Sequence, residues 1–281
     1  MPSSRVSRQV VLLVAAALLA GCGSSPADSS GRSSEPTAQS SPSAAAETAD
    51  ASPSAPEPTS QWSVFAGKTI GIDPGHNGRN HTDPSLINRR IWNGRAYESC
   101  NTTGTSTNDG YSEAAYNWAV ATELRHQLRR AGATVVMTRH SNDGVGPCVD
   151  KRARIINNAH ADVAIDIHAD GSGPANRGFA ILQPVRSGTN NAVVPASRRY
   201  AKLLRDSFAK TGMPVSTYLG NHGLTTRDDL AGLNLTTVPQ VLIECGNMRN
   251  QEDAALLTSP RFQRKAAHQI MAAMAEFLRS R

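Results

Sequence analysis

The chain has 281 residues, a formal net charge of +6 at pH 7 and a sequence pI near 9.4. No stretch combines a basic cluster with interleaved aromatic residues, which argues against a nucleic-acid-binding protein. A mild positive charge suits an exported chain that meets an anionic envelope polymer or a membrane surface.

The first segment, residues 1–22, has the layout of an export signal. Two arginines precede an apolar run over residues 10–20, and this run is too short to cross a membrane. The run ends in Leu-Ala-Gly-Cys, which resembles the lipobox of bacterial lipoproteins, with Cys22 as the lipidated first residue of the mature chain. The alternative is an ordinary signal peptide cut near residues 20–23, with Cys22 incidental. Both interpretations export the protein.

Composition divides the remainder of the chain into two parts. Residues 23–61 consist mainly of Ser, Ala, Pro, Glu and Thr, so they cannot bury enough apolar surface to offset the entropy of an ordered chain. We interpret them as a disordered tether between the membrane and a folded domain. Residues 62–281, about 220 residues, are enough for one domain with a single core.

The first predicted strand covers residues 68–72, where apolar residues alternate until Pro74 and Gly75 end the strand. His76 follows directly, at the position where open α/β sheets place their ligands. A polar loop over residues 77–111 comes next, and loops of this length in compact domains are usually functional. His76 is therefore the first candidate functional residue.

The first long helix is predicted from the N-cap Ser112 to about residue 131. Glu113 lies on the apolar face of this helix, in phase with its inward-facing residues. A carboxylate that only favours the helix dipole does not have to face inward, whereas a buried carboxylate needs a partner. Glu113 is therefore a second candidate.

The remaining predicted elements alternate between strands and helices, which favours an α/β fold with a sheet covered on both faces. They are a strand over 134–138, a helix over 151–161, a strand over 162–170, a short strand over 178–182, a helix over 196–210, mixed loop and short helix over 211–238, a strand over 240–246, and a closing helix, or a pair interrupted near Pro260, over 252–278.

Two of these strands end in further candidate residues, His168 and Glu244. Strand ends are expected to deliver His76, His168 and Glu244 to one rim of the sheet, where the helix start delivers Glu113. Two histidines and a carboxylate are the ligand set of a catalytic zinc whose fourth position is open for water. A glutamate beside such a water is the general base of metal-assisted hydrolysis.

The chain has four cysteines, of which Cys22 is accounted for by the lipobox. Cys100 and Cys148 lie in polar loops of an exported protein, so they are predicted to form a disulfide. The alternative is two free loop thiols. Cys245 lies within an apolar run and is interpreted as a small buried thiol.

In five stretches the chain resembles the zinc-dependent N-acetylmuramoyl-L-alanine amidases, a cell-wall hydrolase family with a DPGH signature. The resemblance extends over about residues 66–280, and the stretches follow the order of the family. They are Gly71–His76 at the first zinc histidine, Ser112-Glu113 at the glutamate ligand, Arg152 with Asn157 and Ala161-Asp162 in the arginine helix, Ile167–Asp170 at the second histidine, and Val241–Gly246, followed by Asn250 and Asp253, at the catalytic glutamate.

This resemblance implies a single domain with a six-stranded mixed, mostly parallel sheet and helices on both faces. It implies that His76, Glu113 and His168 bind one Zn²⁺ and that Glu244 is the catalytic base. The implied reaction is hydrolysis of the amide between N-acetylmuramic acid and the L-alanine of the peptidoglycan stem, in cell-wall turnover or daughter-cell separation. Two alternatives stay open: a zinc carboxypeptidase or endopeptidase of the stem, and a non-catalytic lipoprotein that binds the wall.

Two departures from the family pattern concern the surroundings of the site. The segment 77–111 makes the spacing between His76 and Glu113 much longer than is usual in the family. Asp166 and Asp170 replace the usual serine and asparagine around the second histidine, which adds negative charge near the metal.

Four residues are candidate substrate contacts: Asn80, Trp92, Arg152 and His222. For Trp92 the alternative is packing within its own loop, and for Arg152 it is a structural pairing with an acidic residue near the sheet end. Peptidoglycan stem peptides are the expected partner, together with a membrane reached through lipid on Cys22. Nucleic acid is not an expected partner, and we expect a monomer.

The sequence leaves open whether activity needs a protein activator; some relatives are switched by a helix that blocks the zinc and is displaced by an activator. Residues 77–111 or 186–236 have room for such an element, although the first range shows no clear capped amphipathic helix. The export signal places the chain in the cell envelope, on the outer face of the cytoplasmic membrane or in the periplasmic space. No separate cell-wall-binding domain is expected.

Overall fold

The computed structural model of the chain describes residues 60–280. The predicted export signal, the lipidated Cys22 and almost all of the predicted tether lie outside the described residues. The described part begins with a 3-10 helix, η1 (Ser60–Phe65), which contacts the last helix, α7 (Pro260–Arg279). Within residues 60–280, no helix is both long and apolar enough to cross a membrane.

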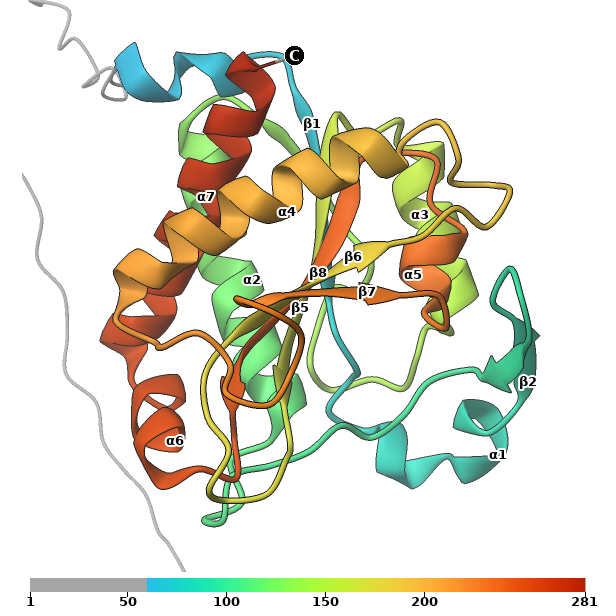
Figure 1. Ribbon diagram of the computed structural model, residues 1–281. Helices are drawn as coiled ribbons and strands as arrows, with labels where there is room; N and C mark the ends of the chain where they lie inside the picture. The colour runs from blue at the N-terminus through green and yellow to red at the C-terminus, as the bar shows by residue number, and fades with distance from the viewer. Residues whose placement is uncertain (1–59, 281) are drawn as a thin grey trace, which may run out of the picture. The chain divides into compact units, whose positions relative to one another are not determined.

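A six-stranded sheet forms the centre of the domain (Figure 1). Its strands lie in the order β4-β1-β5-β8-β6-β7. Neighbouring strands are parallel except β6 and β8, which pair antiparallel. The predicted mixed, mostly parallel sheet is therefore confirmed. The strands are β1 (Thr69–Pro74), β4 (Thr134–Met137), β5 (Val163–Asp170), β6 (Ala180–Pro184), β7 (Leu224–Arg227) and β8 (Gln240–Asn247).

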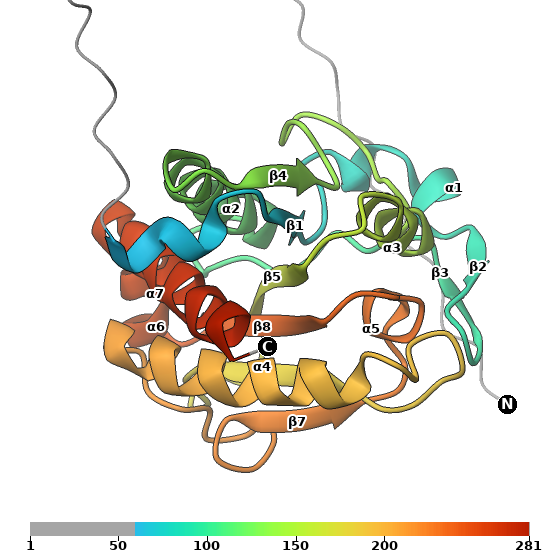
Figure 2. The same cartoon turned by 90° about the horizontal axis from the view of Figure 1, so that it is seen from above.

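Helices cover both faces of this sheet (Figure 2). On one face α7 contacts both α2 and α4, and on the other α3 contacts α5. The predicted closing pair is also present, since α6 ends shortly before Pro260 begins α7. The further helices are α2 (Glu113–Arg130), α3 (Val149–Asn158), α4 (Val194–Phe208), η3 (Ala209–Thr211), α5 (Ala231–Asn234) and α6 (Gln251–Leu257).

The central strand β5 is buried on both faces, as expected for a parallel strand between helix layers. Ile165 and Ile167 join the large core that includes residues of α2, α4 and α7. Ala164 joins a smaller cluster with Ile156 of α3. This alternation leaves Asp166 and His168 on the same face as Ala164, near the carboxyl end of the strand.

The structure adds a strand where the sequence predicted loop and short helix. β7, within residues 211–238, forms the edge of the sheet beside β6. Its four residues, Leu-Thr-Thr-Arg, have no alternation of apolar and polar residues. With four residues and a single apolar side chain, this edge strand is too short and too polar to show the alternation that reveals strands.

The segment 77–111 was predicted as a loop, but it contains short elements. They are η2 (Asn80–Thr82), α1 (Pro84–Ile87) and a hairpin of β2 (Arg90–Trp92) with β3 (Tyr97–Ser99). Elements of three or four residues carry too few periods for a sequence pattern to detect. In the described part of this segment the longest helix has four residues, which leaves no amphipathic blocking helix here.

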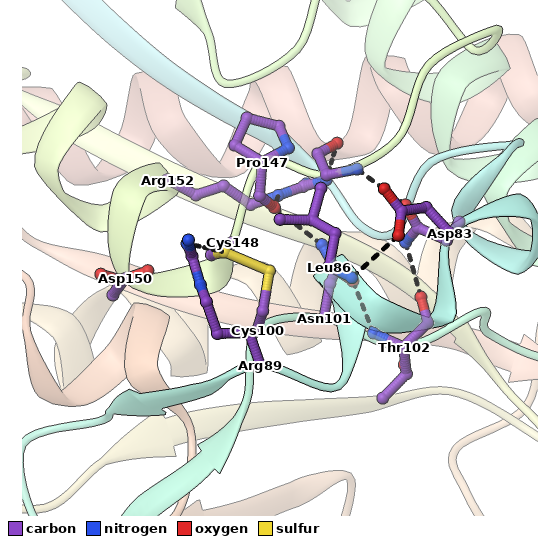
Figure 3. The surroundings of a disulfide bond; sticks show 12 residues. Asp83, Leu86, Arg89, Cys100, Asn101, Thr102, Pro147, Cys148, Asp150 and Arg152 are labelled. Carbon is purple, nitrogen blue, oxygen red and sulfur yellow. Dashed lines mark hydrogen bonds between the residues drawn. A yellow bond between two sulfur atoms is a disulfide. The ribbon is translucent and has the colours of Figure 1, made fainter.

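A disulfide joins Cys100 to Cys148, 48 residues farther along the chain (Figure 3), which confirms the predicted pairing. Cys245 is a buried free thiol, also as predicted. The bond fixes the end of the 77–111 segment to the N-cap of α3, where the Val149 amide also donates to the Cys100 carbonyl at 2.8 Å. Closing a loop of this length stabilises the fold by about 4 kcal/mol in the chain-entropy model.

Candidate active site

Three strand ends and one helix start meet in a single cavity. β5 places His168 directly opposite Glu244 of β8 in the parallel register. His76 follows β1 on the other side of β5. The Ser112 hydroxyl caps α2 by accepting the Ala115 amide at 3.2 Å, and the next residue is Glu113. All four candidate residues line the same cavity, as the sequence predicted.

His76, Glu113 and His168 form a compact cluster. The Nε2 atom of His76 lies 3.0 Å from Oε1 of Glu113, and Nδ1 of His168 lies 2.8 Å from the same oxygen. One ligand atom from each residue falls within 4.8 Å of the other two. Two imidazole nitrogens and one carboxylate oxygen on converging side chains fit the donor set of a catalytic zinc.

Charge and burial set the protonation of this cluster. Glu113 is only 4% exposed. Burial alone would raise the pKa of its carboxyl, but the neighbouring His76 and His168 hold that pKa well below its usual range. Burial would likewise lower the pKa of His168, whereas the carboxylates of Asp166 and Glu113 raise it well above its usual value. Glu113 is thus kept ionised, the state that binds a cation.

Glu244 differs from the cluster in having an unused oxygen. Its Oε2 atom is buried and has no hydrogen-bond partner in the structure. Burial raises the pKa of Glu244 well above its usual value; nearby His168 opposes this shift and the carboxylate of Glu113 adds to it. Glu244 is thus a half-buried carboxylate with an unpaired oxygen and a raised pKa. In the cavity that holds the cluster of His76, Glu113 and His168, such a group is suited to accept and return a proton.

The protein family that this chain matches agrees with this geometry. Residues 70–276 match the family Amidase_3, described as N-acetylmuramoyl-L-alanine amidase. The chain is 36% identical to the N-acetylmuramoyl-L-alanine amidase Rv3717 of Mycobacterium tuberculosis over 221 residues, 76% of this chain and 88% of that protein. The chain belongs to the N-acetylmuramoyl-L-alanine amidase family.

The fold of a solved relative is also close. The crystal structure of the amidase Ami1 from Mycobacterium smegmatis superposes with a TM-score of 0.73 at 41% sequence identity, and the match covers 77% of this chain and 99% of that one. The predicted family and enzyme class are therefore confirmed: this is an N-acetylmuramoyl-L-alanine amidase of the peptidoglycan wall.

The end of the 77–111 segment is part of the amidase site. The Thr102 carbonyl lies 3.1 Å from Nδ1 of His76, and the Thr105 amide donates to Oε2 of Glu113 at 2.9 Å. Gly104 between them has φ +75, and a Cβ there would lie 2.8 Å from both Glu113 and His76. A glycine is therefore needed for this close approach. Sequence reasoning missed these residues, because nothing in their pattern pointed to the site.

Arg152 lines the cavity and holds the framework of the site. It is 1% exposed, and its Nη1 donates to Asp73 at 2.6 Å and to the Pro74 carbonyl at 2.7 Å. Nη2 donates to the carbonyls of His76 and Gly146, and Nε donates to the Pro147 carbonyl. All five guanidinium N–H groups are engaged. These bonds support the structural alternative, in which Arg152 ties α3 to the end of β1; a substrate contact by Arg152 stays a prediction.

Arg139 supports the same corner of the site from the strand side. Its guanidinium donates to the carbonyls of Pro74 and Gly75 and, at 2.9 Å, to that of Ala114 in the first turn of α2. Burial and the neighbouring charge of Arg152 lower the pKa of Arg139 to about 9. The two arginines together join β1 to α2 and α3, the elements that carry His76 and Glu113.

Asn80 also serves the framework, and its substrate contact stays a prediction. The side chain is fully buried, and its Nδ2 donates to the Thr102 carbonyl at 2.7 Å. Its Oδ1 accepts the Gly146 amide at 2.8 Å. Both ends of the amide are therefore used to join the 77–111 segment to the loop before α3.

Trp92 and His222 lie outside the residues that line the cavity. Trp92 of β2 is 49% exposed and packs edge to face against Tyr97, with ring centroids 5.4 Å apart. His222 is exposed in the turn before β7, with a left-handed φ of 47°. A substrate contact by either residue stays a prediction. The cavity lining includes Arg227 instead, which the sequence did not indicate because β7 was not recognised.

Proposed function

We propose that this amidase uses one Zn²⁺, held by His76, Glu113 and His168, to hydrolyse the amide between N-acetylmuramic acid and L-alanine of the peptidoglycan stem. One observation carries the proposal: the two histidines converge on a single oxygen of Glu113, in the cavity where Glu244 has an unpaired buried oxygen. When bound at this cluster, zinc supplies Lewis acidity, which lowers the pKa of a water and polarises a carbonyl.

The side chains of the cavity have distinct roles in this reaction. Oε2 of Glu244 accepts a proton from the attacking water and returns it to the nitrogen of the leaving L-alanine. Glu113 would bind the metal as a carboxylate and the two histidines as neutral imidazoles, and the contacts from Thr102 and Thr105 hold His76 and Glu113 in position. Attack by water on the amide carbonyl then breaks the C–N bond and leaves the lactyl carboxylate on the glycan.

Two other functions compete with this proposal. A zinc carboxypeptidase or endopeptidase would use similar ligands but cut within the stem, and a non-catalytic wall-binding lipoprotein would not cut at all. Membership in the amidase family favours cleavage at the first amide. A buried carboxylate oxygen without a hydrogen-bond partner costs stability, so its retention at Glu244 favours a catalytic protein over a binding protein.

Product analysis separates the three functions. Muropeptides of known composition are digested with the purified protein and analysed by mass spectrometry, with and without a chelator. We expect free stems that begin with L-alanine and glycans that keep the lactyl group. The chelator should abolish this cleavage, and added zinc should restore it. Shortened stems that stay attached to the glycan would support the peptidase instead, and unchanged muropeptides with zinc present would support the binding protein.

We also propose that the amidase works outside the cytoplasmic membrane and is held there by lipid on Cys22. A cell-wall substrate requires an extracytoplasmic enzyme, and the Leu-Ala-Gly-Cys run supplies the lipidation sequence. Cell-wall turnover or daughter-cell separation, alone or with an activator protein, is the role that this location supports. Incorporation of labelled fatty acid into the wild-type chain, and not into Cys22→Ser, is the expected result. Equal labelling of both would rule out this anchor.

A further inference from the structure

Asp166 is a buried carboxylate close to the metal cluster, at a position where the family usually has serine. It is 8% exposed and lines the cavity from β5, two residues before His168. Its Oδ1 atom lies 3.2 Å from Nε2 of His168. A buried carboxylate is costly unless a partner compensates it, so its presence calls for an explanation.

The two histidines of the cluster share one pattern. Each points one ring nitrogen at Glu113 and the other at an oxygen outside the cluster. For His76 the outer oxygen is the Thr102 carbonyl, 3.1 Å from Nδ1. For His168 the outer oxygen belongs to Asp166. Because a neutral imidazole has one N–H and one lone pair, the outer oxygen decides which nitrogen is left to bind a cation.

We propose that Asp166 is a positioning residue of the metal centre: its carboxylate accepts the Nε2 proton of His168 and so directs the Nδ1 lone pair towards the zinc. This inference rests on the proposed zinc function. A carboxylate in this role also makes the imidazole more basic than a serine hydroxyl would, because the N–H donates to a charged acceptor. Tighter zinc binding is the expected consequence.

In the described part of the chain, His168 is the only residue that forms an ion pair with Asp166. Asp73 is its neighbour in the sheet register, but that carboxylate is already paired with Arg152. All the N–H groups of Arg152 donate hydrogen bonds to other oxygens. The contact with His168 has the distance of an ion pair but not the alignment of a hydrogen bond, and Oδ1 has no competing partner.

The test measures zinc affinity rather than activity. Dissociation constants are obtained by chelator competition for the wild-type protein, Asp166→Asn and Asp166→Ala. We expect affinity to fall by about 10-fold for asparagine, which keeps an uncharged acceptor, and by about 100-fold for alanine. The visible absorption of the Co²⁺-loaded protein should change in the same order, because the orientation of one ligand changes. The matched control is Asp162→Asn, since Asp162 precedes the same strand but pairs with Lys68.

The outcomes separate this inference from the zinc proposal. A wild-type protein that does not bind zinc contradicts the proposed function. If the wild-type protein binds zinc and Asp166→Ala binds it within about twofold of the same affinity, the positioning role is wrong. The metal-free variants should be about as stable to denaturant as the wild-type protein, because losing the contact with His168 is offset by removing a buried carboxylate. If the variants lose zinc affinity only to the extent that their metal-free forms also lose stability to denaturant, Asp166 has a structural role and the proposal is overturned.

Discussion

Replacement of Glu244 by glutamine is expected to lower the turnover of peptidoglycan by about 10²–10⁴-fold, the usual contribution of a general acid–base residue. Glutamine has nearly the size of glutamate, so the end of β8 should keep its structure. An amide does not accept and return a proton as a carboxylate does. Turnover is measured as release of stems that begin with L-alanine, and zinc content by elemental analysis, which should stay at the wild-type level.

Glu252→Gln is the matched control for this experiment. Glu252 lies just beyond the same strand, in α6, where its side chain is 72% exposed and pairs with Arg177. We expect wild-type turnover from this variant. Near-normal stem release by Glu244→Gln would show that another group accepts the proton. Loss of zinc together with turnover would show that Glu244 acts as a ligand.

His76→Asn is expected to reduce bound zinc from one per chain to nearly none, and to abolish hydrolysis. The variant removes one of the three protein ligands. Catalytic zinc sites are held by three protein ligands, so the two that are left should not retain the metal. Asparagine is chosen because His76 has a left-handed φ of 58°, a conformation that asparagine tolerates better than alanine. The fold should therefore survive, which circular dichroism and denaturant unfolding of the metal-free protein can check.

The control for this variant is His81→Asn, which changes an exposed histidine in the same segment outside the cluster. Its zinc content should equal that of the wild-type protein. Full zinc occupancy in His76→Asn would contradict the ligand assignment. Full occupancy in His168→Ala as well would mean that the metal binds elsewhere in the chain.

The candidate site follows from the sequence to the extent that it is built from local patterns. Alternation and a Pro-Gly break locate the strand end before His76, and helical spacing places Glu113 on an inward face. The same reasoning locates His168 and Glu244 at strand ends. Each of these inferences needs only a few neighbouring residues, so one sequence was enough. The parallel sheet then brings the strand ends to one rim.

The roles of the surrounding residues did not follow from the sequence. Arg152 and Asn80 have the side chains of substrate contacts, yet every donor of the first and both ends of the second are used inside the protein. Whether a polar side chain is free depends on how many partners packing brings to it. Those partners lie far away along the chain, as with Arg152 and Asp73, which are 79 positions apart.

The sequence by itself determined the fold class, the four residues at the rim and the pairing of Cys100 with Cys148, because strand alternation, helix spacing and cysteine placement are properties of short stretches. Only the tertiary structure decided that the end of the 77–111 segment contacts the cluster, through Thr102 and Thr105. It also decided which nitrogen of His168 faces Glu113 and which faces Asp166. These contacts depend on distances of a few ångströms between separate elements, and no local pattern encodes such distances.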